Sequence, residues 1–226
     1  MTFQRFEELL LLHTTLSSPP CCPELRTREA TSLIPLWEAA EKAENAQVEP
    51  PFWAYSWPGG QALARYILDH PEVVREKVVL DLGCGNGLAA VAAARSGASR
   101  VLANDIDPAA IWMTKVHAAE NGLAVECCLE DLLSAAPPAP PAQVILAGDL
   151  FYARELAARA EAWLRAALEQ GAQVLVGDPG RAYIPRQGLR VLETYVIPVS
   201  PEIESVSQRQ TSVLCLYLDG RLQGGF

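Results

Sequence analysis

The stretch Val78-Val79-Leu80-Asp81-Leu82-Gly83-Cys84-Gly85-Asn86-Gly87 decides the fold of this 226-residue chain. An apolar run ends there in a carboxylate and a loop of alternating glycines, and an alanine-rich helical stretch follows. A second apolar run then closes on Asn104-Asp105-Ile106-Asp107. A strand, a glycine-rich turn, a helix and a second strand that ends in a carboxylate are how an α/β sheet binds a nucleoside. The sequence therefore predicts an enzyme that uses one.

The spacing of the glycines indicates which nucleoside it is. A dinucleotide site requires G-x-G-x-x-G/A, so that a third small residue lets helix and strand pack closely beside a pyrophosphate. Leu88 occupies that third position here. Asp81 places a carboxylate beside the loop, and a carboxylate suits a cationic amino group better than a phosphate. S-adenosylmethionine carries such a group and no phosphate, so it is the predicted cofactor.

Asp105 stands at the expected end of the second strand, where it is able to accept hydrogen bonds from both ribose hydroxyls of that cofactor. Ile106, the next residue, is expected at the cofactor as well. A structural interpretation remains open, in which the glycines only form a tight turn and Asp105 caps the helix opened by Pro108. The register of carboxylate, glycine loop and second carboxylate favours the cofactor interpretation.

Composition indicates the class of protein and restricts the kinds of partner that it is expected to bind. A chain of this length that is 50% apolar is able to bury one sizeable core. The net charge of −9 would repel a phosphate backbone, so nucleic acid is not expected as a substrate, whereas a basic protein acceptor would be attracted. No apolar run approaches membrane-spanning length and no signal peptide is recognisable, so we expect a cytoplasmic protein.

The cysteines predict no metal site, because their spacing matches no metal-binding motif. Their number and scatter are typical of a reducing compartment. The six are Cys21, Cys22, Cys84, Cys127, Cys128 and Cys215.

Apolar runs and helical stretches alternate along most of the chain, which predicts a parallel sheet wound on both faces. Strands are expected at residues 78–82, 100–104, 125–129, 144–147 and 174–176, and helices at 61–68, 88–96, 108–121 and 154–170. Residues 191–199 and 211–218 are expected to form a closing antiparallel hairpin. Before the sheet, helices are expected over residues 2–16 and about 24–44, the second interrupted at Pro35. This N-terminal part is interpreted as a lid or an extension on the substrate side.

Polar residues that follow the strands are the candidates for binding and catalysis, because strand ends face the ligand in such a sheet. After the third strand, a carboxylate at Glu130 or Asp131 would take the adenine amino group, or else cap a helix. After the fourth strand, Asp149 and Tyr152 would hold an acceptor amine by charge and hydrogen bond. The alternative makes Asp149 a helix cap and places Tyr152 in the core, to which Phe151 is assigned.

An aromatic segment precedes the sheet at residues 52–57. Phe52 and Trp53 are expected to pack the extension onto the core. Trp57 stands against Pro58-Gly59-Gly60, where backbone can approach a ligand closely, so either a packing role or a place in the site is open to it.

On these residues the chain resembles the seven-β-strand S-adenosylmethionine-dependent methyltransferases, and among them the lysine methyltransferases with a D-x-x-Y motif after the fourth strand, here Asp149-Leu150-Phe151-Tyr152. Between Pro51 and Arg181 it is similar to the lysine methyltransferases of the electron-transfer flavoprotein β-subunit. The segments that carry this similarity are Trp53-Ala54, residues 57–63, Asp81-Leu82-Gly83, residues 97–100, residues 102–108 and Gly177-Asp178-Pro179-Gly180-Arg181.

The resemblance implies a Rossmann-like α/β fold, with residues 1–50 as an N-terminal helical extension and 51–226 as the methyltransferase domain. It also implies roles for single residues. It implies contacts to S-adenosylmethionine for Trp57, Gly83, Gly85, Asp105 and Asp131, and a lysine channel for Asp149 and Tyr152. Further candidates for contact with the cofactor are Asp81, Ile106 and Asp149. The loop Gly83-Cys84-Gly85-Asn86-Gly87-Leu88 differs from that of the animal members and no mitochondrial targeting segment is present, which favours a bacterial member.

The implied activity is transfer of methyl groups to lysine side chains of the electron-transfer flavoprotein β-subunit. Methylation of a ribosomal protein or of a small-molecule amine, and a binding module without activity, remain alternatives. Ribosomal-protein methyltransferases carry an Asn-Pro-Pro-Tyr-like motif after the fourth strand, which this chain lacks. The oligomeric state is left open.

Overall fold

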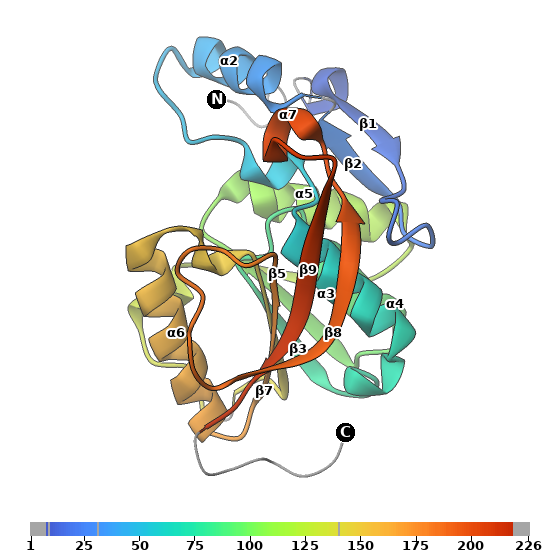
Figure 1. Cartoon of the computed structure of the whole chain (residues 1–226). Helices are drawn as coiled ribbons and strands as arrows, with labels where there is room; N and C mark the ends of the chain where they lie inside the picture. The colour runs from blue at the N-terminus through green and yellow to red at the C-terminus, as the bar shows by residue number, and fades with distance from the viewer. Residues whose placement is uncertain (1–7, 9, 31, 140, 219–226) are drawn as a thin grey trace.

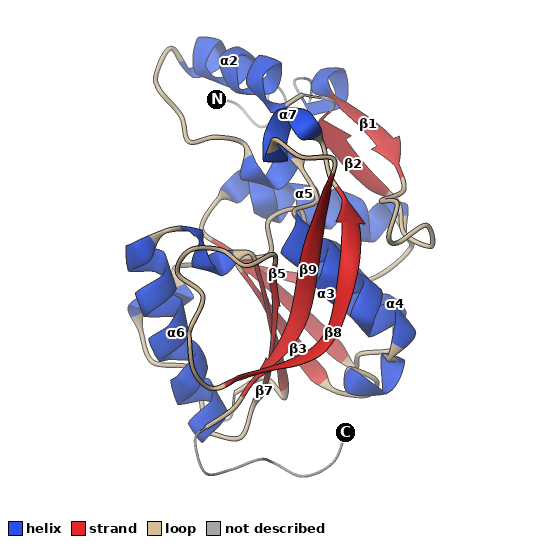
Figure 2. Ribbon diagram, viewed as in Figure 1, coloured by secondary structure: helices blue, strands red, loops and turns tan. Residues whose placement is uncertain are grey.

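The protein is described here from a computed structural model that covers residues 8, 10–30, 32–139 and 141–218. A seven-stranded sheet runs through the molecule, with helices on both faces (Figures 1 and 2). The strand order is β5-β4-β3-β6-β7-β9-β8. Strands β3 to β7 are parallel to their neighbours, whereas β9 pairs antiparallel with both β7 and β8. The Rossmann-like fold with a closing antiparallel hairpin is confirmed.

The strands lie close to where the sequence placed them. They are β3 (Val78–Leu82), β4 (Arg100–Asp105), β5 (Glu126–Leu129), β6 (Val144–Gly148), β7 (Gln173–Asp178), β8 (Leu189–Pro198) and β9 (Gln208–Leu216). The helices are α2 (Leu33–Glu44), α3 (Pro58–Asp69), α4 (Leu88–Arg95), α5 (Pro108–Glu120), α6 (Arg154–Glu169) and the short α7 (Pro201–Glu204). Single 3₁₀ turns lie at Phe52–Ala54, Pro71–Val73, Leu132–Ser134 and Leu150–Tyr152.

Alternation along the strands builds a core on each face of the sheet, because successive side chains of a strand point to opposite faces. Val79 belongs to the core under α3, α4 and α5, whereas its neighbour Leu80 belongs to the core under α6. In the same way Ile145 packs on the α6 side and Leu146 on the other. Burial on both faces explains the continuous apolar runs of these strands.

The N-terminal extension differs from the expected pair of helices. Residues 10–13 are helical, but β1 (Thr14–Ser17) and β2 (Thr27–Ala30) then form an antiparallel hairpin, in which Thr14 pairs with Ala30. Threonine is favoured in strands, and this hairpin gains further contacts from α5 behind it. The remainder of the expected first helix, residues 2–7 and 9, lies outside the described residues.

The second expected helix is shorter than predicted and is not interrupted. It begins at Leu33, so Pro35 lies in its first turn, where the missing N–H of proline costs no helical hydrogen bond. Leu36 of this helix is buried in the same core cluster as Trp53.

His117 of α5 connects the hairpin to the glycine loop. Its Nδ1 lies 2.7 Å from the carbonyl oxygen of Asn86, and its Nε2 lies 2.7 Å from the backbone N of Arg28 in β2. The Arg28 N–H must donate, so the imidazole is neutral and carries its proton on Nδ1. Burial lowers the pKa of His117 to about 4.

The lowered pKa of His117 predicts that the folded state becomes less stable in acid. The unfolded chain binds the proton at its ordinary pKa of 6.5, and the folded chain binds it only near 4, so stability is lost as the pH falls through that window. The contribution is about 2–3 kcal/mol. Urea denaturation of the wild type and of His117→Gln at pH 7 and pH 4.5 measures it.

We expect the wild type to lose that much more stability than the variant over this pH step. Burial raises the pKa of Asp81 to about 7, which acts in the opposite sense, but Asp81 is present in both proteins and its effect cancels in the comparison. Equal losses in the two proteins would contradict the prediction.

No helix among the described residues is both long and apolar enough to cross a membrane.

Candidate functional site

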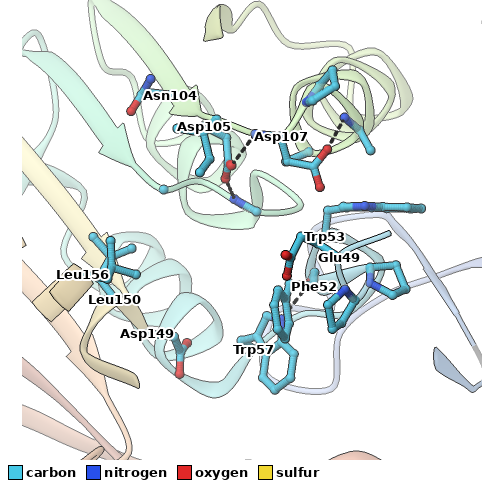
Figure 3. A pocket seen from close by; sticks show the side chains of 18 of the residues that line it. Glu49, Phe52, Trp53, Trp57, Asn104, Asp105, Asp107, Asp149, Leu150 and Leu156 are labelled. Atoms are coloured by element: carbon cyan, nitrogen blue, oxygen red, sulfur yellow. Dashed lines mark hydrogen bonds between the residues drawn. The ribbon is translucent and has the colours of Figure 1, made fainter. Parts of the chain in front are cut away.

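A cavity of about 1120 Å³ opens at the carboxyl ends of β3, β4 and β6. The chain turns from β5 back to β6 beside β3, so the order of the strands reverses between β3 and β6. This switch point is where open α/β sheets bind their ligands. The loop after α2 covers the cavity from the side of the extension, through residues 48–53. Figure 3 shows Glu49, Phe52 and Trp57 on one side of the cavity and Asp105 and Asp107 across from them.

The glycine loop adopts a backbone that other residues rarely adopt. Gly83, Gly85 and Gly87 have φ values of 66°, 55° and 75°, and Gly87 is the residue from which α4 begins. Nothing lies within 4 Å of the position that a Cβ on Gly85 would occupy, and Gly85 lines the cavity. A ligand is therefore able to approach the backbone of this loop directly.

Asp105 lies at the end of β4 with both carboxylate oxygens oriented by backbone. Oδ2 accepts from Gly85 N at 2.9 Å and Oδ1 accepts from Asp107 N at 3.0 Å. Each oxygen is able to accept a further hydrogen bond, and Asp105 lines the cavity (Figure 3). Burial raises the pKa of Asp105, so additional hydrogen-bond donors would stabilise its charged form. The cap of α5 is Asp107, whose side chain accepts from Ala109 N, and not Asp105.

Asp81 is close to this loop but does not line the cavity. Its Oδ2 accepts a 3.0 Å hydrogen bond from Ala90 N in the first turn of α4, and it is buried. The carboxylate thus stabilises the N-terminus of the helix that follows the loop. A direct contact between Asp81 and the cofactor stays a prediction.

The side of the cavity near β5 is suited to an aromatic base. Ile106 is 72% exposed there, and Leu132 and Leu133 lie opposite the strand ends. Asn104 holds the β5 end in place, because its Nδ2 donates to the carbonyl oxygens of Cys128 and Glu130. Carbonyl and apolar groups in this arrangement are typical of a nucleoside pocket.

Asp131 also lines this side, where Arg159 of α6 donates to its Oδ2 at 2.6 Å. Glu130, the alternative partner for the adenine amino group, is not among the residues that line the cavity.

Aromatic rings surround the other end of the cavity. Trp57 donates its indole N–H to the carbonyl oxygen of Phe52, and the two rings lie 5.8 Å apart. Tyr152 is 51% exposed and lies 6.0 Å from the Phe52 ring. Phe52 therefore lines the cavity and does not simply pack the extension onto the core. Trp53 is buried beside α2 as expected, and it lines the cavity as well. Phe151 is buried in the core under α6, as predicted.

Asp149 lies at this aromatic end and is already paired. Its Oδ1 accepts from Nε and Nη2 of Arg181, at 3.0 and 2.5 Å, and its Oδ2 accepts from Gly60 N at 3.1 Å. Burial raises the pKa of Asp149 to about 6, and the guanidinium opposes this rise. Its backbone is left-handed, with a φ of 56°, and its side chain does not cap the 3₁₀ turn that follows it. The bond from Gly60 N instead caps the first turn of α3.

Arg181 was missed among the candidate residues, although it ends the motif Gly177-Asp178-Pro179-Gly180-Arg181 that carried the family resemblance. Arg181 lies close to Asp149 because of the turn after β7, and no local pattern in the sequence indicates this proximity.

The structure brings most of the candidate residues together around one cavity. They are Trp57, Gly83, Gly85, Asp105, Ile106, Asp131, Asp149 and Tyr152. Their individual roles stay predictions.

S-adenosylmethionine fits the residues present. A backbone-held carboxylate suits the ribose, the open glycine backbone suits the amino-acid part, and an exposed apolar side chain suits the base. The cavity exceeds the size of common ligand pockets, so a cofactor and an acceptor side chain are both accommodated.

Comparison with known proteins identifies the family of the chain. The family model described as ribosomal protein L11 methyltransferase (PrmA) matches residues 61–176, from α3 through β7. The electron transfer flavoprotein beta subunit lysine methyltransferase of Xenopus laevis is 44% identical over 175 residues, which are 76% of this chain and 70% of that protein. The protein of the same name from Danio rerio is 40% identical over 203 residues, covering 88% and 78% of the two chains.

Among solved structures, the magnesium protoporphyrin IX methyltransferase of Synechocystis with bound S-adenosylhomocysteine superposes with a TM-score of 0.50. It is 15% identical and covers 70% of this chain and 82% of its own, so this likeness concerns the fold. The fold, the cofactor and the methyltransferase class predicted from the sequence are thus confirmed. Because the two relatives are 44% and 40% identical to this chain over most of their length, the chain belongs to the family of electron transfer flavoprotein β-subunit lysine methyltransferases.

Proposed function

We propose that this protein methylates lysine side chains of the electron-transfer flavoprotein β-subunit. The observation that carries the proposal is the aromatic end of the cavity, where the neighbouring rings of Phe52, Trp57 and Tyr152 line the same cavity as Asp149. The names of the relatives supply the identity of the acceptor protein.

The reaction is a displacement in which S-adenosylmethionine supplies a methyl group bound to a sulfonium. The lone pair of a neutral ε-amine forms the new N–C bond, the C–S bond breaks, and its electron pair stays on sulfur. The methylammonium product loses a proton to water. Because the leaving group requires no acid, positioning and exclusion of water are the contributions left to the protein.

The residues at the aromatic end are suited to these tasks. The faces of Trp57 and Tyr152 attract the charge that develops on nitrogen. Asp149, held from both sides by Arg181 and by Gly60, positions the amine and is not a strong base. Burial raises the pKa of Tyr152 as well, so its phenol is protonated and serves as a hydrogen-bond donor.

Charge favours a basic acceptor surface. The chain carries a net charge of −9, and Glu44 and Glu49 line the cavity on the side of the extension. A surface rich in lysine would be attracted to this opening.

Transfer of a labelled methyl group tests the proposal. Incubated with S-adenosylmethionine, the protein should label one or two lysines of purified electron-transfer flavoprotein β-subunit. Replacing these lysines by arginine should end the labelling, because guanidinium stays protonated and is no nucleophile. Mass spectrometry of the labelled protein identifies the sites.

A parallel incubation with cell lysate and with free amines separates the alternatives. Labelling of a ribosomal protein, or of free amines alone, with an unlabelled flavoprotein subunit would reject the proposed acceptor. Absence of any methyl transfer would favour a binding module.

A further inference from the structure

Arg181 is held inside the cavity by two independent sets of contacts. Its guanidinium donates twice to one oxygen of Asp149, and the guanidinium carbon lies 5.7 Å from the centre of the Trp57 ring. Its backbone is fixed as well, because Oδ1 of Asp178 accepts from the N atoms of Gly180 and Arg181 at 2.7 Å each. This turn at the end of β7 directs the side chain back over the sheet toward Asp149.

A lone carboxylate at the position of Asp149 would hinder methyl transfer. An opposite charge within about 4–6 Å favours the charged form of a titratable group, typically by 1–3 pKa units. Without Arg181, burial would raise the pKa of the Asp149 carboxyl further, but a lysine beside it would take up that proton and form an ammonium–carboxylate pair. An ammonium ion has no lone pair to attack the methyl group. Asp149 is only 8% exposed, so water screens this effect little.

We propose that Arg181 is a positioning residue that occupies the Asp149 carboxylate, so that the acceptor amine enters beside a neutral ion pair and reacts uncharged. This inference rests on the proposed function of the cavity. It assigns to Arg181 an effect on the protonation of the acceptor, exerted through Asp149.

Other charged groups surround the pair, and they stay in place when it is changed. Glu204 of α7 lies 3.8 Å from Nη2 of Arg181, and its second oxygen accepts from Arg209 of β9 at 2.9 Å. Asp178 acts on Asp149 from the end of β7. Across the cavity, the carboxylates that act on Tyr152 are Glu49 and Asp105. Arg181→Met removes the contact to Glu204 as well, so the comparison of the single with the double variant isolates the contribution of Asp149.

The test is the pH dependence of kcat with the acceptor protein. Arg181→Met frees Asp149, so the pH at which kcat reaches half its maximum should rise by at least about one unit, with kcat at pH 7 reduced about tenfold or more. Arg181→Lys keeps the charge and should retain most of the wild-type profile. The double variant Arg181→Met with Asp149→Asn should return the half-maximum toward that of the wild type.

A binding measurement separates this role from a structural one. In the presence of S-adenosylhomocysteine, which transfers no methyl group, Arg181→Met should bind the acceptor protein as tightly as the wild type or more tightly at pH 7. Its affinity for S-adenosylmethionine, measured by calorimetry, should be unchanged. Arg100→Met is the matched control, because Arg100 is exposed at the opposite end of β4 and should leave the pH profile unaltered.

Distinct results overturn the inference and the function on which it rests. An unshifted pH profile in Arg181→Met, or a shift that persists in the double variant, would overturn the role of Arg181 while lysine methylation stands. Loss of cofactor binding in Arg181→Met would also overturn it, because the residue would then belong to the cofactor site. A wild type that labels no lysine would reject the proposed function together with this inference.

Discussion

Asp105→Ala should weaken the binding of S-adenosylmethionine by about 2–4 kcal/mol, which is roughly a 30- to 1000-fold loss of affinity. The variant would lack the two charge-assisted hydrogen bonds that we predict to the ribose, and Gly85 N and Asp107 N lose their acceptor. Titration calorimetry on the purified variant measures the loss. The fold should be retained, because Asp105 is only half-buried at the end of its strand.

Glu126→Ala is the matched control, since it removes one carboxylate from the neighbouring strand β5 at an exposed position. It should leave the affinity for the cofactor unchanged. Equal affinities of Asp105→Ala and the wild type would remove Asp105 from the site. Tight binding of NAD by the wild type would contradict the cofactor assignment itself.

Gly59→Ala should destabilise the fold by about 3 kcal/mol or more, because overpacking against backbone has little room for relaxation. The first turn of α3 lies directly on β6 and β7 at this point. A Cβ on Gly59 would lie 2.2 Å from the carbonyl oxygen of Gly177 and 2.5 Å from Oδ2 of Asp149. Relief of this overlap requires movement of α3, which carries the Gly60 N–H that holds Asp149.

Gly60→Ala supplies the comparison within the same helical turn. Nothing lies within 4 Å of a Cβ on Gly60, so this variant should be as stable as the wild type or more stable by about 0.5–1 kcal/mol. Urea denaturation of the wild type, Gly59→Ala and Gly60→Ala measures these differences in stability. Equal stability of Gly59→Ala and the wild type would show that the contact between α3 and β7 is looser than described.

Much of the fold was predictable because its signals are local. Residues 78–87 contain a strand and the positive-φ glycines that a turn into α4 requires, so their geometry needs no distant partner. Alternating burial on two faces and the regular succession of strands and helices then restrict the sheet to one common topology. For the same reason Gly83, Gly85 and Asp105 were found from the sequence, since strand ends meet at one edge.

Tertiary structure decided the features that depend on residues far apart in the chain. Strands β1 and β2 pair beside α5, whose His117 accepts a hydrogen bond from the backbone of Arg28, and no local pattern carries that information. Arg181 reaches Asp149 across 32 positions only because β6 and β7 are neighbours and Asp178 turns the chain. Local propensity determined the sheet and the cofactor loop, whereas packing between distant segments determined which charges meet in the cavity.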